Sequence, residues 1–104
     1  MEQMNEIYWK LKKLSRHNIK NTIESCVKIQ EEVGELSAEL LKFRGKKGHR
    51  GLTQEQLDEN ILEECCDIIN MTLFFMIKRK YSYKRIMKAF KRKINKIESQ
   101  INQR

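Results

Sequence analysis

The chain has 104 residues, of which 35% are charged and 39% hydrophobic, and it carries a formal net charge of +8. This length suits one domain with a single modest core, which we expect to span residues 1–104. No apolar run is long enough to cross a membrane, and the first residues lack a signal-peptide core. The absence of proline and the presence of only four glycines favour an all-α protein.

Two helices are predicted in the first half of the chain. The first spans about 3–15, where apolar residues recur at helical spacing. The second spans about 22–44, opens with Asn21 or Thr22 as its cap, and carries an apolar stripe along one face. Three of the four glycines lie in the segment that follows, so we expect a loop over 45–52.

Two further helices are predicted after this loop. The third begins at Thr53, with Gln56 in the capping-box position, and runs to about Lys80. Over 68–77 it is apolar on nearly every side, and such a helix needs more neighbours than three other helices provide. We therefore expect a homo-oligomer, either a dimer or a tetramer. Ser82 caps a fourth helix whose apolar residues again share one face.

The three cysteines give no sign of a disulfide framework. Their number is odd, and two of the three, Cys65 and Cys66, are neighbours while Cys26 lies far from them in the sequence. A reduced protein in the cytoplasm is the simplest interpretation, with the cysteines packed as small core residues. A zinc site is not indicated, because there is no Cys/His pair at ligand spacing.

Charge is distributed unevenly along the chain. Residues 1–77 have a balance of −2, whereas residues 78–104 contain eleven Lys and Arg against the single Glu98, a balance of +10. A strongly basic last helix attracts polyanions such as nucleic acid, anionic lipid or a phosphorylated small molecule.

Two pairs of carboxylates lie at the edges of the apolar stripes. Glu32 and Glu35 are three residues apart on the second helix, as are Glu64 and Asp67 on the third. Such pairs share a helix face, and the two pairs face each other if the helices pack antiparallel. A cluster of this kind must be protonated, salt-bridged to the basic helix, or filled by a divalent cation. Carboxylate ligands favour Mg²⁺, with Mn²⁺ as a substitute.

The same residues carry a family resemblance. EEVGE (31–35) followed by ECCD (64–67) resembles the EExxE…ExxD signature of the MazG-like nucleoside triphosphate pyrophosphohydrolases, in the all-α NTP pyrophosphatase superfamily. The resemblance covers about residues 15–80. It implies a four-helix bundle that binds Mg²⁺ through Glu32, Glu35, Glu64 and Asp67, with Glu31 as an additional ligand or a water-positioning base.

The resemblance also implies a reaction, the hydrolysis of a (d)NTP to (d)NMP and pyrophosphate. Bound Mg²⁺ screens the triphosphate and activates water, and Glu31 or Glu35 is the candidate base. Residues that we expect to contact the nucleotide are polar, basic or aromatic: Asn70, Lys46, Arg50, Lys78, Lys93, Trp9 and His17.

The alternative is a basic helical module that binds nucleic acid or regulates a partner, with a purely structural acidic cluster. Its support is the basic C-terminal helix, in which Tyr81, Tyr83 and Phe90 are interleaved with Lys and Arg. Such a module binds DNA or RNA in a salt-sensitive manner and is indifferent to Mg²⁺. A third interpretation is a bundle-forming antitoxin-like or assembly partner. It leaves Asp67 unexplained, because this carboxylate directly precedes the apolar run 68–77, where we expect burial, and burial of a carboxylate without a partner is costly.

Overall fold

The computed structural model describes residues 2–17, 21–43 and 51–103, and the described residues are nearly all helical. The α-helices are α1 (Glu2–Leu14), α2 (Thr22–Phe43), α3 (Gln54–Lys78) and α4 (Tyr83–Asn102), and a 3₁₀ turn, η1 (Ser15–His17), follows α1. The predicted all-α class and the four helices are confirmed, with ends that differ by one or two residues. The 3₁₀ turn η1 was not predicted.

Capping side chains fix where the helices begin. The Asn21 side chain accepts a hydrogen bond from the backbone N–H three residues on at 2.8 Å. Thr53 Oγ1 accepts from Gln56 N–H at 3.1 Å, and the Gln56 side chain accepts from Thr53 N–H at 2.8 Å. Ser82 Oγ accepts a hydrogen bond from Arg85 N–H at 3.2 Å and caps α4. These bonds satisfy amides that have no partner inside the helix, so the predicted caps are confirmed.

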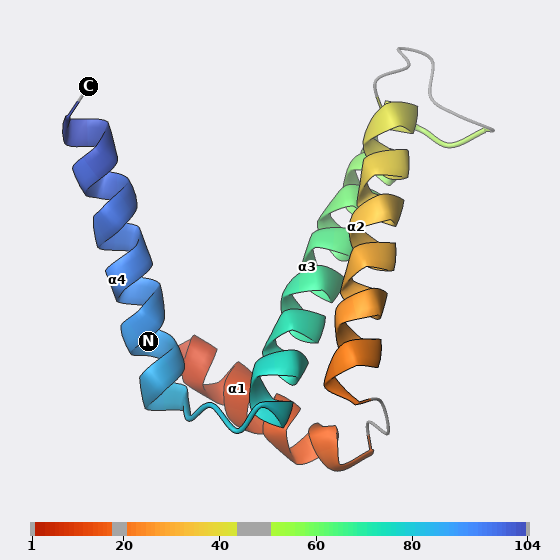
Figure 1. Cartoon of the computed structure of the whole chain (residues 1–104). Helices are drawn as coiled ribbons and strands as arrows, with labels where there is room; N and C mark the ends of the chain where they lie inside the picture. The colour runs from red at the N-terminus through yellow and green to blue at the C-terminus, as the bar shows by residue number, and fades with distance from the viewer. Residues whose placement is uncertain (1, 18–20, 44–50, 104) are drawn as a thin grey trace.

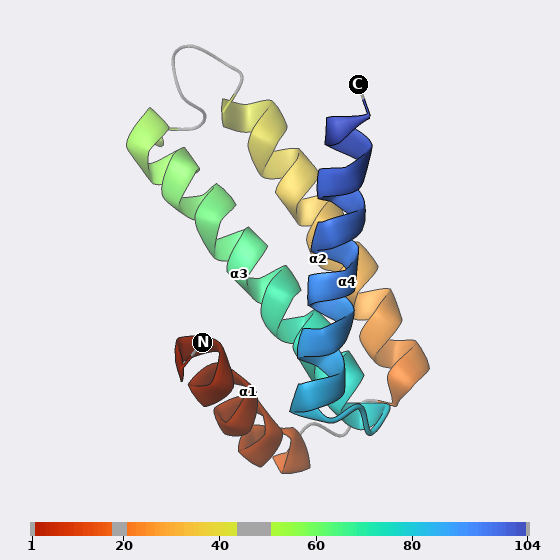
Figure 2. The same ribbon diagram turned by 90° about the vertical axis from the view of Figure 1, so that its left-hand side faces the viewer.

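Helices α2 and α3 lie side by side as an antiparallel hairpin, α1 crosses the C-terminal end of α3, and α4 diverges from the hairpin (Figures 1 and 2). The radius of gyration is 16.9 Å, whereas a compact domain of this length has about 13 Å. Within the described part of the chain, α4 therefore does not close a bundle with the hairpin. The four-helix bundle stays a prediction, which an assembly of chains could satisfy.

The core lies where α1, the end of α3 and the start of α4 meet. Its buried members come from all three helices: Tyr8, Leu11, Leu73, Ile77 and Ile86. The Tyr8 hydroxyl donates a hydrogen bond to the backbone carbonyl of Tyr81 at 3.1 Å, which ties α1 to the turn before α4. This junction fixes the N-terminal turns of α4, and the rest of the helix extends away from it (Figure 1).

Much of the predicted core is exposed in the single chain. Within 68–77 only Leu73 and Ile77 are buried, and Ile69 is 54% exposed. The apolar stripe of α4 is exposed beyond its first turns, and so is part of the stripe of α2. The exposed large apolar side chains on α2, α3 and α4 are Ile23, Val27, Val33, Leu40, Leu41, Leu62, Ile69, Phe90, Ile94, Ile97 and Ile101.

The cysteines also differ from expectation. All three are free, as predicted, but Cys26 and Cys66 are exposed and only Cys65 is partly buried, so they are not core residues in the single chain. None of the described helices is both long and apolar enough to cross a membrane.

Replacing Leu73 by alanine should lower the free energy of unfolding by about 2–5 kcal/mol, because a side chain only 3% exposed leaves a cavity. The matched variant Leu14→Ala removes the same atoms from a side chain that is 49% exposed, and should cost less than about 1 kcal/mol. Urea denaturation followed by circular dichroism measures both. Equal losses would contradict the placement of the core.

Candidate metal centre

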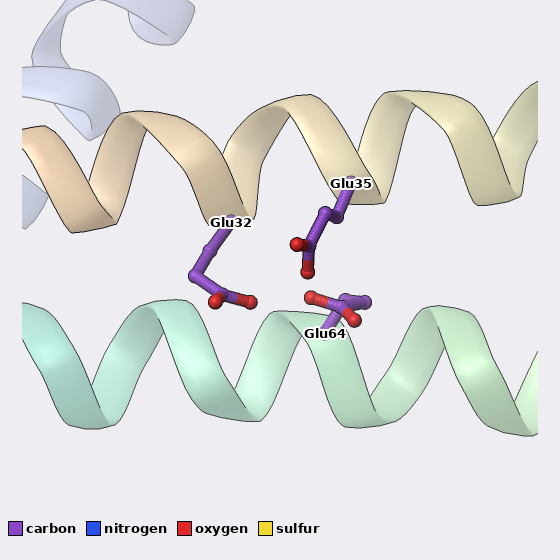
Figure 3. Close-up of side chains that lie close together, drawn as sticks. All are labelled: Glu32, Glu35 and Glu64. Atoms are coloured by element: carbon purple, nitrogen blue, oxygen red, sulfur yellow. The ribbon is translucent and has the colours of Figure 1, made fainter.

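Three carboxylates meet between the two helices of the hairpin. Glu32 and Glu35 project from α2, one turn apart, and Glu64 projects toward them from α3 (Figure 3). One carboxylate oxygen of each residue lies within 4.8 Å of the others. Glu32 is buried, Glu64 is partly buried and Glu35 is exposed, so the cluster is at the edge of the helix interface. The predicted meeting of acidic residues across two antiparallel helices is confirmed for these three.

Glu32 and Glu64 are joined by a hydrogen bond, and the opposite shifts of their pKa values place its proton on Glu64. The hydrogen bond to Glu32, burial, and the charges of Glu32, Glu35 and Asp67 together raise the pKa of Glu64 to about 7. The same hydrogen bond, followed by one from Lys28, lowers the pKa of Glu32. A protonated Glu64 therefore donates to an ionised Glu32, which relieves part of the repulsion in the cluster.

The donor set suits a hard divalent cation. Glu64 Oε2 is buried and makes no hydrogen bond to a described residue, so one oxygen of the cluster lacks a partner. Buried carboxylate oxygens without partners are costly, and a cation that takes the place of the shared proton would satisfy them. Carboxylate oxygens from two helices match the preferences of Mg²⁺ and Mn²⁺.

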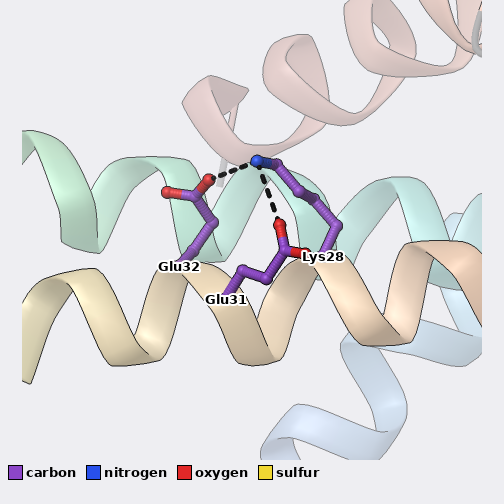
Figure 4. A network of polar contacts seen from close by, with 3 residues as sticks. All are labelled: Lys28, Glu31 and Glu32. Carbon is purple, nitrogen blue, oxygen red and sulfur yellow. Dashed lines mark ion pairs between the residues drawn. The ribbon is translucent and has the colours of Figure 1, made fainter.

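Lys28 is a part of the site that sequence reasoning missed. Its Nζ lies 3.2 Å from Glu32 Oε1 and 3.4 Å from Glu31 Oε2 (Figure 4). These bonds raise the pKa of Lys28. The i,i+4 spacing of Lys28 and Glu32 was the available signal, because residues at this spacing meet on a helix surface.

Asp67 does not occupy the buried position that we expected. The side chain is exposed in the single chain, so the premise that it needs a partner against the cost of burial is wrong. No described residue of α4 forms an ion pair with it. Its charge does raise the pKa of Glu64, so it lies near enough to act on the cluster. Its role as a fourth ligand stays a prediction.

Glu31 lies beside the cluster and outside the three facing carboxylates. Its side chain is 59% exposed and pairs with Lys28. Glu35, by contrast, belongs to the cluster while keeping access to solvent. Of the two predicted bases, Glu35 is thus the better placed.

The predicted nucleotide contacts are scattered. Lys46 and Arg50 lie outside the described residues. Lys78 and Trp9 line a hollow at the far end of α3, and Lys78 is fourteen residues from Glu64, which corresponds to about 21 Å along the helix. Asn70 and His17 are exposed. Lys93 lies on the diverging α4.

Comparisons with protein-family models, with curated proteins and with solved structures found no match to this chain. The family resemblance therefore rests on the two acidic motifs and on the helices that carry them.

The raised pKa of Glu64 predicts how stability changes with pH in the absence of metal. Because the folded chain holds a proton that the unfolded chain releases above pH 4.5, the contribution of Glu64 to stability is complete below that pH and lost as the pH rises through about 7. In EDTA, the urea concentration at the midpoint of unfolding should therefore be lower at pH 8 than at pH 5.5.

Glu64→Gln should remove most of this fall, while Glu63→Gln, a change at the exposed neighbouring residue, should leave it in place. An equal fall in the Glu64→Gln protein would show that Glu64 does not carry the shared proton.

Proposed function

We propose that the protein is a Mg²⁺-dependent nucleoside triphosphate pyrophosphohydrolase that converts a (d)NTP to the (d)NMP and pyrophosphate. One observation carries the proposal: Glu32 and Glu35 of α2 face Glu64 of α3 with carboxylate oxygens within 4.8 Å. The two motifs that supply these residues are the ones that resemble the MazG-like signature. Three of the four ligands that the resemblance implies thus belong to the cluster.

Each side chain has a role that its chemistry suits. Glu32, Glu35 and Glu64 would hold the cation, and Asp67, on the turn of α3 after Glu64, is the proposed fourth ligand. When bound, Mg²⁺ (or Mn²⁺) would screen the charge of the triphosphate and lower the pKa of a water molecule. Loss of the Glu64 proton on binding would leave all of the cluster carboxylates ionised.

The base and the phosphate contact are proposed from position. Glu35 is the exposed member of the cluster and would take the proton of the attacking water. Glu31 is the second candidate, although its ion pair with Lys28 must first break. Lys28, whose ammonium group also lies 3.2 Å from Glu32, would contact a substrate phosphate once a cation takes its place on Glu32.

Incubation with a panel of canonical and modified (d)NTPs tests the reaction. Pyrophosphate release should require Mg²⁺ and should fall at least about 10²-fold in Glu35→Gln and in Glu64→Gln. Glu63→Gln removes the same charge from the exposed residue next to the cluster, and should keep the rate within about twofold. If Glu63→Gln keeps its activity, the loss of a charge near the site cannot by itself explain the loss of activity in Glu35→Gln and Glu64→Gln.

The proposal is contradicted by a folded protein that releases pyrophosphate from no nucleotide, or at the same rate in EDTA. A Glu63→Gln protein as impaired as Glu64→Gln would also contradict the assignment of the cluster.

We further propose that the chain acts as a homo-oligomer in which α4 of one copy covers the hairpin of another. The single chain exposes 8658 Å², whereas a compact monomer of 12.6 kDa exposes about 6,200 Å². Helices α2 and α3 together have a net charge of −8, and α4 has +6. Apolar stripes flanked by opposite charges are complementary surfaces.

Nucleic-acid binding through α4 is the alternative. The basic residues of α4 support it, but its exposed apolar stripe supports a protein partner more strongly. Ile94, Ile97 and Ile101 are each more than half exposed, and exposed apolar stripes mark protein interfaces.

Ile97→Asp should weaken self-association at least about tenfold, because it places a charge in the middle of the α4 stripe. Ser99→Asp adds the same charge on the opposite face of α4 and should assemble as the natural chain does. Sedimentation velocity over a range of concentrations measures both. A natural chain that stays monomeric, or an Ile97→Asp protein that assembles normally, would contradict the interface.

A further inference from the structure

A second candidate binding site lies at the junction of α1, η1, the end of α3 and the turn that leads into α4. A hollow of about 720 Å³ opens there, which is within the range of small-molecule sites. Lys78 on its wall is about 21 Å along α3 from Glu64. The hollow is therefore separate from the candidate metal centre of the same chain.

The wall of the hollow is basic. Five cationic side chains line it: Lys12, Lys13, Arg16, Lys78 and Lys80. None of the described lining residues is acidic. Lysines on a solvated surface are usually interspersed with carboxylates that neutralise them, as Lys28 and Lys42 are on α2. Cations that converge on a hollow without carboxylates create a positive potential that attracts an anion.

Lys80 strengthens this interpretation. Its backbone φ is 66°, a left-handed conformation in which glycine or asparagine is favoured over lysine. The backbone at this position therefore gives no reason for a lysine, whereas a cation on the wall of the hollow does.

Aromatic rings complete the wall. Trp9 is 53% exposed although it packs edge-on against the buried Tyr8, at 5.2 Å between ring centroids. Lys12 Nζ lies 5.0 Å from the centre of the Trp9 ring. The Tyr81 ring lies near Arg85, whose guanidinium carbon is 4.8 Å from its centre. A hydrogen bond from Arg79, with the charges of Arg79 and Arg85, lowers the pKa of the Tyr81 phenol, consistent with a positive environment.

We propose that this hollow binds a nucleotide, with the basic side chains on the phosphate and the exposed Trp9 ring on the base. Phosphate oxygens accept hydrogen bonds from lysine and arginine, and a base stacks on an aromatic face. The ligand is either a free nucleotide or one nucleotide unit of a single strand, since both present the same phosphate and base. The inference does not depend on hydrolysis at the metal centre.

Binding in the hollow can be followed by tryptophan fluorescence, because Trp9 is the only tryptophan in the chain. In metal-free buffer, the intact protein is titrated with inorganic phosphate, with AMP and with a short oligothymidylate while tryptophan fluorescence is followed. AMP should give a saturable change at millimolar concentration or below, with at least about fivefold tighter binding than phosphate.

The double variant Lys12→Gln/Arg16→Gln should weaken nucleotide binding at least about tenfold. The matched control Lys91→Gln/Lys96→Gln removes two cations from α4, outside the hollow, and should change binding by less than about twofold. Trp9→Phe, measured by calorimetry, should reduce the preference for AMP over phosphate. Circular dichroism establishes that each variant is folded.

The two sources of the nucleotide give different results. A strand-binding site holds the oligothymidylate more tightly than AMP, with a steeper dependence on salt, whereas a free-nucleotide site prefers AMP. Three results would overturn the proposal: no saturable change with AMP or oligothymidylate up to about 5 mM, equal binding of AMP and phosphate, or equal weakening in the α4 control. Failure here would leave the metal-centre proposal untouched, because neither metal nor hydrolysis is involved.

Discussion

The meeting of like charges between α2 and α3 is the constraint on which the proposed chemistry depends. Glu32, Glu35 and Glu64 bring carboxylate oxygens within 4.8 Å of one another, and such a group is stable only if something neutralises it. Without metal, a proton shared by Glu32 and Glu64 and the ammonium group of Lys28 do so in part. A buried Glu64 oxygen still lacks a partner. We propose that a divalent cation supplies the charge and the coordination that these groups do not.

The apolar stripe of α4 is a second feature that the single chain leaves largely exposed. Its first turns are anchored in the core through Ile86, but Ile94, Ile97 and Ile101 face solvent. The α2–α3 hairpin likewise exposes apolar side chains and has the opposite charge. We propose self-association as the simplest way to bury both surfaces, with the basic helix of one copy beside the acidic hairpin of another. The basic hollow around Trp9 lies at the C-terminal end of α3, so the chain separates two regions of opposite potential.

Local patterns predicted much of this from sequence. Thr53 and Ser82 were identified as caps, and Asn21 as one of two candidates, because capping depends on neighbouring residues alone. The facing of Glu32 and Glu35 with Glu64 followed from i,i+3 spacing and antiparallel packing. The exposure of Asp67 was not predictable, because the apolar run beside it indicates burial without saying whether another chain provides it. The hollow at Trp9 was not predictable either, because it forms between segments that are distant in sequence.

Calorimetric titration of the protein with Mg²⁺ at two pH values tests the central claim most directly. If the cation displaces the proton of Glu64, whose pKa is about 7, binding should be about tenfold tighter at pH 8 than at pH 6 and should release a proton at the lower pH. Glu64→Gln should weaken binding, and its remaining affinity should lose this dependence. Absence of Mg²⁺ binding at millimolar concentration, or binding that Glu64→Gln leaves unchanged, would contradict a metal centre built on these three carboxylates.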